Sequence, residues 1–189
     1  GEGGKERRER EGREGEKRTR EAKAWLRGVQ VFGEDDSFVA GNTNALLRWS
    51  GDAWSTQIES ATGHLEEVWV APDGTAFAVG RRVYRRVEEE WTEVPLTSSD
   101  WYGVWGRSAE DVYVVGIEGV ILHFDGTNWS EMSSGVTTFL RGVGGSVSGP
   151  VYAVGEGARC SSWMSTAGSR SDHRPTTLWR TSWCWRMEH

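Results

Sequence analysis

The sequence contains little cysteine or proline and no long apolar run. It holds 2 Cys and 4 Pro among 189 residues, and no stretch approaches the roughly 18 apolar residues of a membrane span. Cys160 and Cys184 match no zinc-site spacing and provide no disulfide framework. We therefore predict no metal site, no cofactor and no membrane span.

An excess of positive charge is also missing. The chain carries 22 Lys and Arg against 28 Asp and Glu, a net charge of −6, whereas nucleic-acid-binding domains usually present a basic surface. We predict no nucleic-acid partner. No apolar secretion signal is visible, since residues 1–23 are nearly all charged or glycine. These features leave the compartment unknown.

Three zones differ in composition. Residues 1–23 contain nine basic and seven acidic side chains and almost nothing apolar, so we expect a charged, disordered arm. Residues 24–157 hold nearly all of the regular pattern, and residues 158–189 depart from it. Glycine and tryptophan are both abundant, at 25 and 12 residues.

An internal repeat explains much of this glycine and tryptophan. Four segments align without gaps, starting 39, 36 and 39 residues apart: LRGVQVFGEDDSFVAG from Leu26, LEEVWVAPDGTAFAVG from Leu65, WYGVWGRSAEDVYVVG from Trp101 and LRGVGGSVSGPVYAVG from Leu140. The fourth column is valine in every copy. The thirteenth column is aromatic, with Phe38, Phe77, Tyr113 and Tyr152. The sixteenth column is glycine, with Gly41, Gly80, Gly116 and Gly155.

The second half of each unit repeats as well. ALLRWSGDAWS from Ala45 matches VILHFDGTNWS from Val120, and RVYRRVEEEWT from Arg82 is a weaker copy. Each unit therefore reads as four short strands, and Asp-Gly between apolar runs is typical of a hairpin turn. Four strands in 36–39 residues match the spacing of propeller blades.

We predict an all-β fold, a partial β-propeller with about three full four-stranded blades, part of a fourth and irregular ends. The expected blade boundaries are 24–64, 65–100, 101–139 and 140–157. Because propellers usually have four to eight blades, we expect this chain to need further blades or self-association to close a ring. We also expect it to be an incomplete part of a longer protein.

The best copy, GVWGRSAEDVYVVGIEGVILHFDGTNW from Gly103 to Trp129, resembles tandem repeats of bacterial β-propeller proteins, notably those of myxobacteria. The resemblance covers residues 25–157. It implies the propeller fold and favours an extracytoplasmic location, and it implies no particular activity. The DGTNW stretch is also similar to the Asp-box of sialidase-like propellers, although Gly126 directly follows Asp125 and so departs from that spacing.

The repeated aromatic residues are the main candidates for a site. Trp54, Trp91 and Trp129 share one column, and Trp69 and Trp105 share another. Their repetition favours packing between neighbouring blades, and a stacking platform for sugar rings is the alternative. We expect Trp101 and Tyr102, near the start of a blade, to be the exposed pair. The predicted ligand-binding residues are Trp101, Tyr102, Trp69 and Trp105.

No residue pattern predicts catalysis. His64 and His123 lie in different columns, which favours structural roles over metal ligation. Asp36 and Asp111 share a column, and we expect them to accept backbone N–H bonds in turns. The sequence therefore predicts a non-catalytic binding or scaffold module with a protein or glycan ligand. Two alternatives stay open: a lectin-like, carbohydrate-binding propeller, and a fragment of a propeller hydrolase whose catalytic residues lie elsewhere.

The tail breaks the repeat after Gly157. A strand such as ALL or VILHFDG is expected there, but the chain reads ARCSSWMSTAGSRSDHRPTTLWRTSWCWRMEH, in which no strand pattern is evident. One hypothesis is a frameshift in a GC-rich gene. If Ala158–Met164 is encoded GCG CGC TGC TCG TCG TGG ATG, removing two bases gives A-L-L-V-V-D, the strand that the repeat expects.

The gene sequence tests this hypothesis directly. We expect the DNA that encodes residues 158–189 to continue the repeat when it is read in a shifted frame. The frameshift hypothesis is wrong if no shift of frame restores the repeat.

Overall fold

The computed structural model describes residues 25–43, 45–58, 63–96, 100–157 and 183–187. These residues form strands and one short 3₁₀ turn, η1 (Ile117–Gly119). The first sheet contains β1 (Leu26–Gly33), β2 (Asp36–Gly41), β3 (Leu46–Trp49) and β4 (Trp54–Thr56). The second contains β5 (Leu65–Val70), β6 (Ala76–Gly80), β7 (Val83–Val87) and β8 (Glu90–Val94). The third contains β9 (Trp101–Ser108), β10 (Asp111–Gly116), β11 (Ile121–Phe124) and β12 (Trp129–Met132).

The fourth sheet contains β13 (Leu140–Gly145), β14 (Val151–Gly155) and β15 (Trp183–Met187). Strand β15 pairs antiparallel with β14, so the structure differs here from the irregular tail expected over 158–189. The charged arm predicted for 1–23 and the rest of that tail lie outside the described residues. In the described part of the chain no helix is long and apolar enough to cross a membrane.

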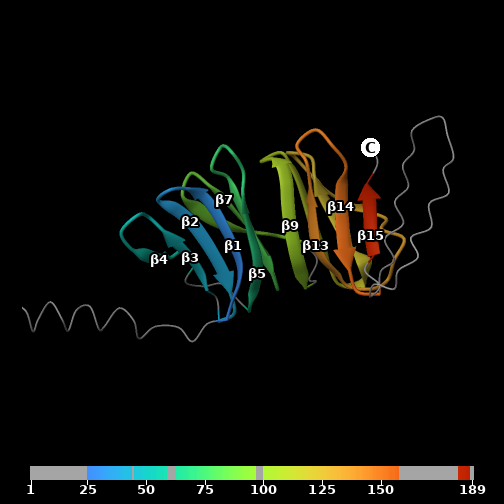
Figure 1. Cartoon of the computed structure of the whole chain (residues 1–189), viewed down its shortest axis with the longest axis horizontal. Helices are drawn as coiled ribbons and strands as arrows, with labels where there is room; N and C mark the ends of the chain where they lie inside the picture. The colour runs from blue at the N-terminus through green and yellow to red at the C-terminus, as the bar shows by residue number, and fades with distance from the viewer. Residues whose placement is uncertain (1–24, 44, 59–62, 97–99, 158–182, 188–189) are drawn as a thin grey trace, which may run out of the picture.

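The four sheets stand beside one another in chain order (Figure 1). Every sheet is an antiparallel meander, and the first strands β1, β5, β9 and β13 contact one another in succession. Three apolar clusters lie at the steps between successive sheets. The middle strands β6 and β10 are therefore covered on both faces, which explains their nearly continuous apolar sequence. The predicted partial propeller is confirmed.

Aromatic rings join neighbouring sheets in a repeated way. The ring of Trp91 on β8 meets Phe38 of the preceding sheet edge-on, with centroids 6.1 Å apart. Trp129 on β12 meets Phe77 of its preceding sheet in the same way, at 6.2 Å. The prediction that this tryptophan column packs between blades is thus confirmed for these two residues. Trp54, in the same column of the first sheet, is exposed.

A second repeated contact places a tryptophan against a glycine. A Cβ at Gly106 on β9 would lie 2.7 Å from Cη2 of Trp69 on β5, and a Cβ at Gly145 on β13 would lie 3.1 Å from Cη2 of Trp105 on β9. Where the tryptophan column holds Gln30 instead, the next sheet carries Val70 in place of glycine. The bulky ring and the glycine therefore accommodate each other between the second and third sheets and between the third and fourth.

The two aligned aspartates bind side chains rather than turn amides, which corrects the expectation. Asp36 accepts two hydrogen bonds from Arg48, at 2.9 and 2.8 Å. Asp111 pairs with Nε2 of His123 at 2.8 Å and accepts from Arg107 at 2.8 Å. In the first and third sheets these pairs link the second strand to a neighbouring strand.

The turn role belongs to other aspartates. The carboxylate of Asp125 accepts from the backbone N–H groups of Thr127 and Asn128, at 2.8 and 2.7 Å. Asp73 accepts from the N–H of Thr75 at 2.9 Å. Both residues are followed directly by glycine at positive φ, as expected for Asp-Gly turns.

The contact between Trp69 and Gly106 gives a stability prediction. Substituting Gly106→Ala places a methyl group 2.7 Å from the Trp69 ring and 2.8 Å from the carbonyl oxygen of Asp111. We expect the free energy of unfolding, measured by urea denaturation, to fall by about 1–3 kcal/mol.

Gly144→Ala provides the matched control on the neighbouring strand β13. A Cβ there meets nothing within 4 Å, so we expect stability to be unchanged or higher by up to about 1 kcal/mol. Equal losses in the two variants would contradict the proposed ring-against-glycine contact.

Candidate functional site

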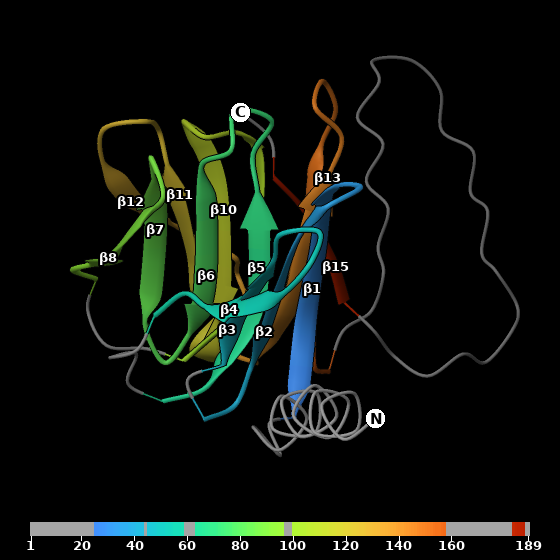
Figure 2. The same cartoon turned by 90° about the vertical axis from the view of Figure 1, so that its left-hand side faces the viewer.

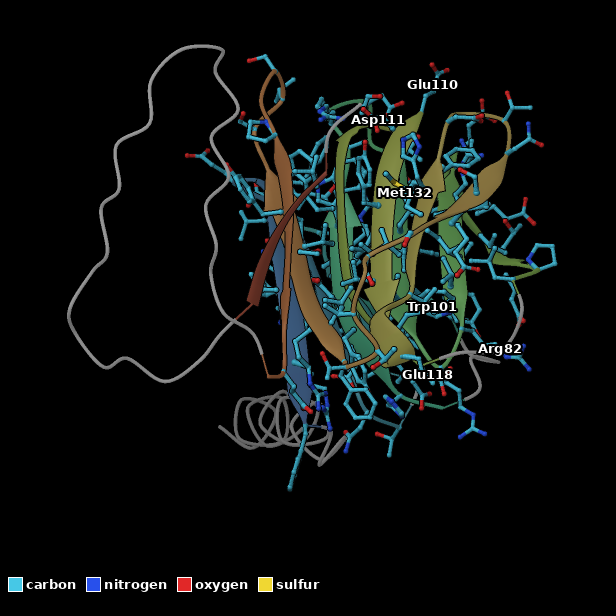
Figure 3. The ribbon with its side chains drawn as sticks, turned by 90° about the vertical axis from the view of Figure 1, so that its right-hand side faces the viewer. Arg82, Trp101, Glu110, Asp111, Glu118 and Met132 are labelled. Carbon is cyan, nitrogen blue, oxygen red and sulfur yellow. The ribbon has the colours of Figure 1, made fainter. Side chains whose placement is uncertain are left out.

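A cavity of about 390 Å³ opens among the four first strands. It is lined by residues of β1, β5, β9 and β13, namely Arg27, Gly28, Glu66, Glu67, Tyr102, Arg141 and Gly142. All of these occupy the second or third column of the repeat. Figure 3 shows Trp101, the first residue of β9, at the opposite end of its sheet from Glu110 and Asp111. Tyr102 of the cavity follows Trp101 directly in the chain.

A bulge shared by the four first strands explains why these columns line the cavity. The first column is apolar and, in the second to fourth sheets, buried: Leu65, Trp101 and Leu140. Every first strand has a register shift between its first and third columns. This bulge interrupts the strict alternation of side chains, so the first column joins the same core cluster as the fourth column, while the second column lines the cavity. Four separate strands thereby bring Arg27, Glu66, Tyr102 and Arg141 to one cavity.

Opposite charges are paired along the wall of the cavity. Nη1 of Arg27 donates to Oε2 of Glu66 at 2.8 Å, and Nε2 of His64 lies 3.3 Å from the other oxygen of that carboxylate. On the far side, Nε of Arg141 donates to Glu156 at 3.0 Å. This hydrogen bond raises the pKa of Arg141, which therefore stays charged at every physiological pH.

The guanidinium of Arg141 also covers an aromatic ring. Its central carbon lies 4.3 Å from the centroid of the Tyr102 ring and 5.4 Å from that of Phe139. A cation placed over a ring face in this way is attracted by the electron density of the ring. The site therefore contains an arginine and a tyrosine that are held together before any ligand arrives.

Glu67 breaks the pattern of its column. The other three sheets have Gly28, Gly103 and Gly142 at this position. A Cβ at Gly28 would lie 2.7 Å from Cα of Glu67, so β1 and β5 approach closely. Between β5 and β9 the carboxylate of Glu67 instead accepts the backbone N–H of Val104 at 2.9 Å. Burial raises the pKa of the Glu67 carboxyl, and this hydrogen bond opposes the rise.

The structure separates the four aromatic residues predicted to bind ligand. Trp101 is only 2% exposed and lies in the core between the second and third sheets, so the expectation that it is exposed is wrong. Its column is apolar in all four copies because that column faces the core. Trp69 is buried in the same cluster, and Trp105 is partly buried against it. Tyr102 alone lines the cavity.

Sequence reasoning missed the charged residues of the site. Arg27, Glu66 and Arg141 share the second column with Tyr102. That column is polar or amphipathic in every copy, although it lies within apolar strands. A polar column repeated on the innermost strand was the signal that could have identified the cavity.

Outside the cavity, ionisable side chains of the third sheet contact one another. His123 is stacked on the Tyr113 ring, with centroids 4.5 Å apart, and it pairs with Asp111. Burial tends to raise the pKa of Asp111, but hydrogen bonds from Arg107 and His123 outweigh it and lower the pKa. No cluster of three or more His, Cys, Asp or Glu side chains able to hold a metal ion occurs among the described residues.

The solved structures that are similar to this chain agree with its architecture. No family model matches the chain. The chain is similar to immune protein Tsi7 of Pseudomonas aeruginosa, with 30% identity over 173 residues, 79% of this chain and 55% of that protein. Its fold is similar to that of U3-55K, with a TM-score of 0.62, 12% identity and coverage of 74% of this chain and 48% of U3-55K.

A second similar structure is YCF48 from Cyanidioschyzon merolae, with a TM-score of 0.55, 16% identity and coverage of 72% of this chain and 52% of YCF48. Both solved structures are β-propellers, so the fold class of this chain is a β-propeller. The chain spans about half the length of each of these relatives.

Glu67 generates a prediction about pH. Its folded-state pKa is raised, so the folded state loses stability as pH rises through that pKa and the buried carboxyl ionises. Glu67→Gln keeps an oxygen acceptor for the Val104 N–H and removes the ionisation. We expect the free energy of unfolding of this variant, relative to the natural protein, to increase between about pH 4 and about pH 7.

Urea denaturation at several pH values measures this difference. Glu131→Gln, at an exposed position on β12, is the control for replacing a glutamate outside the core. If the free energies of unfolding of Glu67→Gln and the natural protein differ by the same amount at every pH, ionisation of the buried Glu67 carboxyl does not lower the stability of the folded state.

Proposed function

We propose that this chain is a non-catalytic propeller module that binds a protein partner at the cavity among its first strands. The single observation that carries the proposal is the cavity itself, where Arg27, Glu66, Tyr102 and Arg141 are gathered from four strands. Tyrosine and arginine are the side chains that most often dominate protein–protein binding energy.

The charges of the site fit a peptide chain. The side chains of Arg27 and Arg141 are nearly half exposed, so each can donate further hydrogen bonds to a partner's carboxylate or carbonyl groups. Glu66 and Glu67 offer acceptors beside them. Donors and acceptors that alternate around one opening suit the mixed polarity of a protein segment.

The lectin-like alternative has less support. A sugar platform needs an open aromatic face, whereas Trp69 and Trp101 are buried between sheets. The ring of Tyr102 is covered on one side by the Arg141 guanidinium at 4.3 Å. The sequence relative is named an immune protein, and this name supports a protein-binding role.

Peptide selection tests the proposal. The 189-residue protein is immobilised and panned with a random peptide library, and the enriched peptides are then measured by calorimetry. We expect Tyr102→Ala and Arg141→Ala each to weaken binding by about tenfold or more, since a central interface residue contributes about 2 kcal/mol.

Arg82→Ala is the matched control. Arg82 lies on the turn between β6 and β7 (Figure 3), and its side chain is about as exposed as those of Arg27 and Arg141 and is likewise paired with a glutamate. Its loss should leave affinity unchanged. Peptides that bind the Tyr102 and Arg141 variants as tightly as the natural protein would refute the cavity as the binding site. Binding on a glycan array that disappears with Tyr102→Ala would instead support the lectin-like alternative.

A further inference from the structure

The first sheet has an uncovered apolar face. Val29 is 68% exposed, although Val68 and Val104 in the same column are only 2% and 3% exposed. Leu26 is 57% exposed, and Leu65 in its column is 2% exposed. In the second and third sheets this face packs on the preceding sheet. In the first sheet no described strand lies in front of it (Figure 2).

The last sheet is uncovered on the opposite face. On β14 the side chains alternate between buried and exposed. Tyr152 is 42% exposed, whereas Phe38, Phe77 and Tyr113 in its column are fully buried. Val154 is 39% exposed, and its column is also fully buried in the other three sheets. This is the face that the following sheet covers at every internal step.

Each open face carries one of the two aromatic partners that meet where neighbouring sheets pack together. At internal steps a second-strand ring meets a fourth-strand tryptophan of the following sheet, as in Phe38 with Trp91. Tyr152 is a second-strand ring without a described following sheet, and Trp54 is a fourth-strand tryptophan without a described preceding sheet. Trp54 is 51% exposed. By the same pattern, Tyr152 is the expected partner of a tryptophan equivalent to Trp54 on a sheet outside this chain.

The first sheet also offers a hollow that suits such a ring. A depression of about 410 Å³ on its open face is lined by Val29, Ser37, Val39, Trp49 and Trp54. Two valines and two tryptophans make this lining mostly apolar, and aromatic rings gain from both area burial and edge-to-face contacts.

We propose that two copies of this chain join head to tail, with the last sheet of each copy packed on the first sheet of the other. The first and last sheets lie on opposite sides of the chain (Figure 1), so both faces can be used at once. The matched part of this chain covers 48% and 52% of the two similar propeller chains. With four sheets in each chain, two copies supply eight sheets, within the four to eight usual for a closed propeller.

Pairing of like faces does not satisfy the same groups. If two first sheets faced each other, Trp54 would meet Trp54, and Tyr152 and Val154 would stay exposed. Only the head-to-tail arrangement covers both open faces and repeats the internal contact. The two resulting interfaces are identical and related by a two-fold axis, which closes the assembly.

Light scattering coupled to size-exclusion chromatography tests the proposal on the 189-residue protein. We expect the mass of two chains for the natural protein. Val29→Glu and Val154→Glu each place a carboxylate in both interfaces of the pair, so each should weaken association by about 100-fold or more. Val147→Glu, at a 74% exposed position outside both faces, should leave the pair intact.

Mixing the two disrupted variants gives a sharper test. A Val29→Glu copy and a Val154→Glu copy share one interface that carries both substitutions and one that carries neither. We expect the mixture to associate more strongly than either variant alone and less strongly than the natural protein. Circular dichroism confirms that each variant retains its strands.

Three results would overturn the proposal. The first is a mass of one chain at the highest protein concentration, which would mean that another partner covers these faces. The second is a series of larger masses, which would mean that the ring does not close with two copies. The third is a Val154→Glu variant that still forms a pair, which would indicate that the first sheets of the two copies face each other.

Discussion

The contact between neighbouring sheets is the interaction on which the rest of the structure depends. Each sheet is only three or four short strands wide, and such a sheet cannot bury its apolar side chains alone. Phe38 and Phe77 are fully buried because the next sheet places Trp91 and Trp129 against them. Stability is thus distributed over the steps between sheets, as in other repeat proteins.

The same stacking creates the cavity. Close approach of the first strands at Gly28 and Gly103 leaves the second column of each repeat facing a shared opening. Tyr102 and Arg141 meet there although they are far apart in the sequence. A rigid stack that presents variable side chains at one end can acquire different partners without changing its core.

The repeat predicted the sheets and the packing tryptophans because each column recurs with the same partner. It misplaced Trp101, which was expected to be exposed, since position near the start of a unit was weighed above the apolar character of its column. It missed Arg27 and Arg141 because single copies show only scattered charges, and the cavity exists only when four strands converge. The side-chain partners of Asp36 and Asp111 depend on pairing across strands, which no local motif encodes.

The most direct test of this account is oxidative footprinting of three tryptophans that share one column, read by mass spectrometry over a range of protein concentrations. Trp91 and Trp129 pack between sheets, so we predict that they resist oxidation at every concentration. Trp54 lies on the open face, and we predict that it is oxidised in dilute solution and becomes protected as copies associate. Equal protection of all three in the most dilute sample, or reactivity of Trp54 that never changes, would contradict the account.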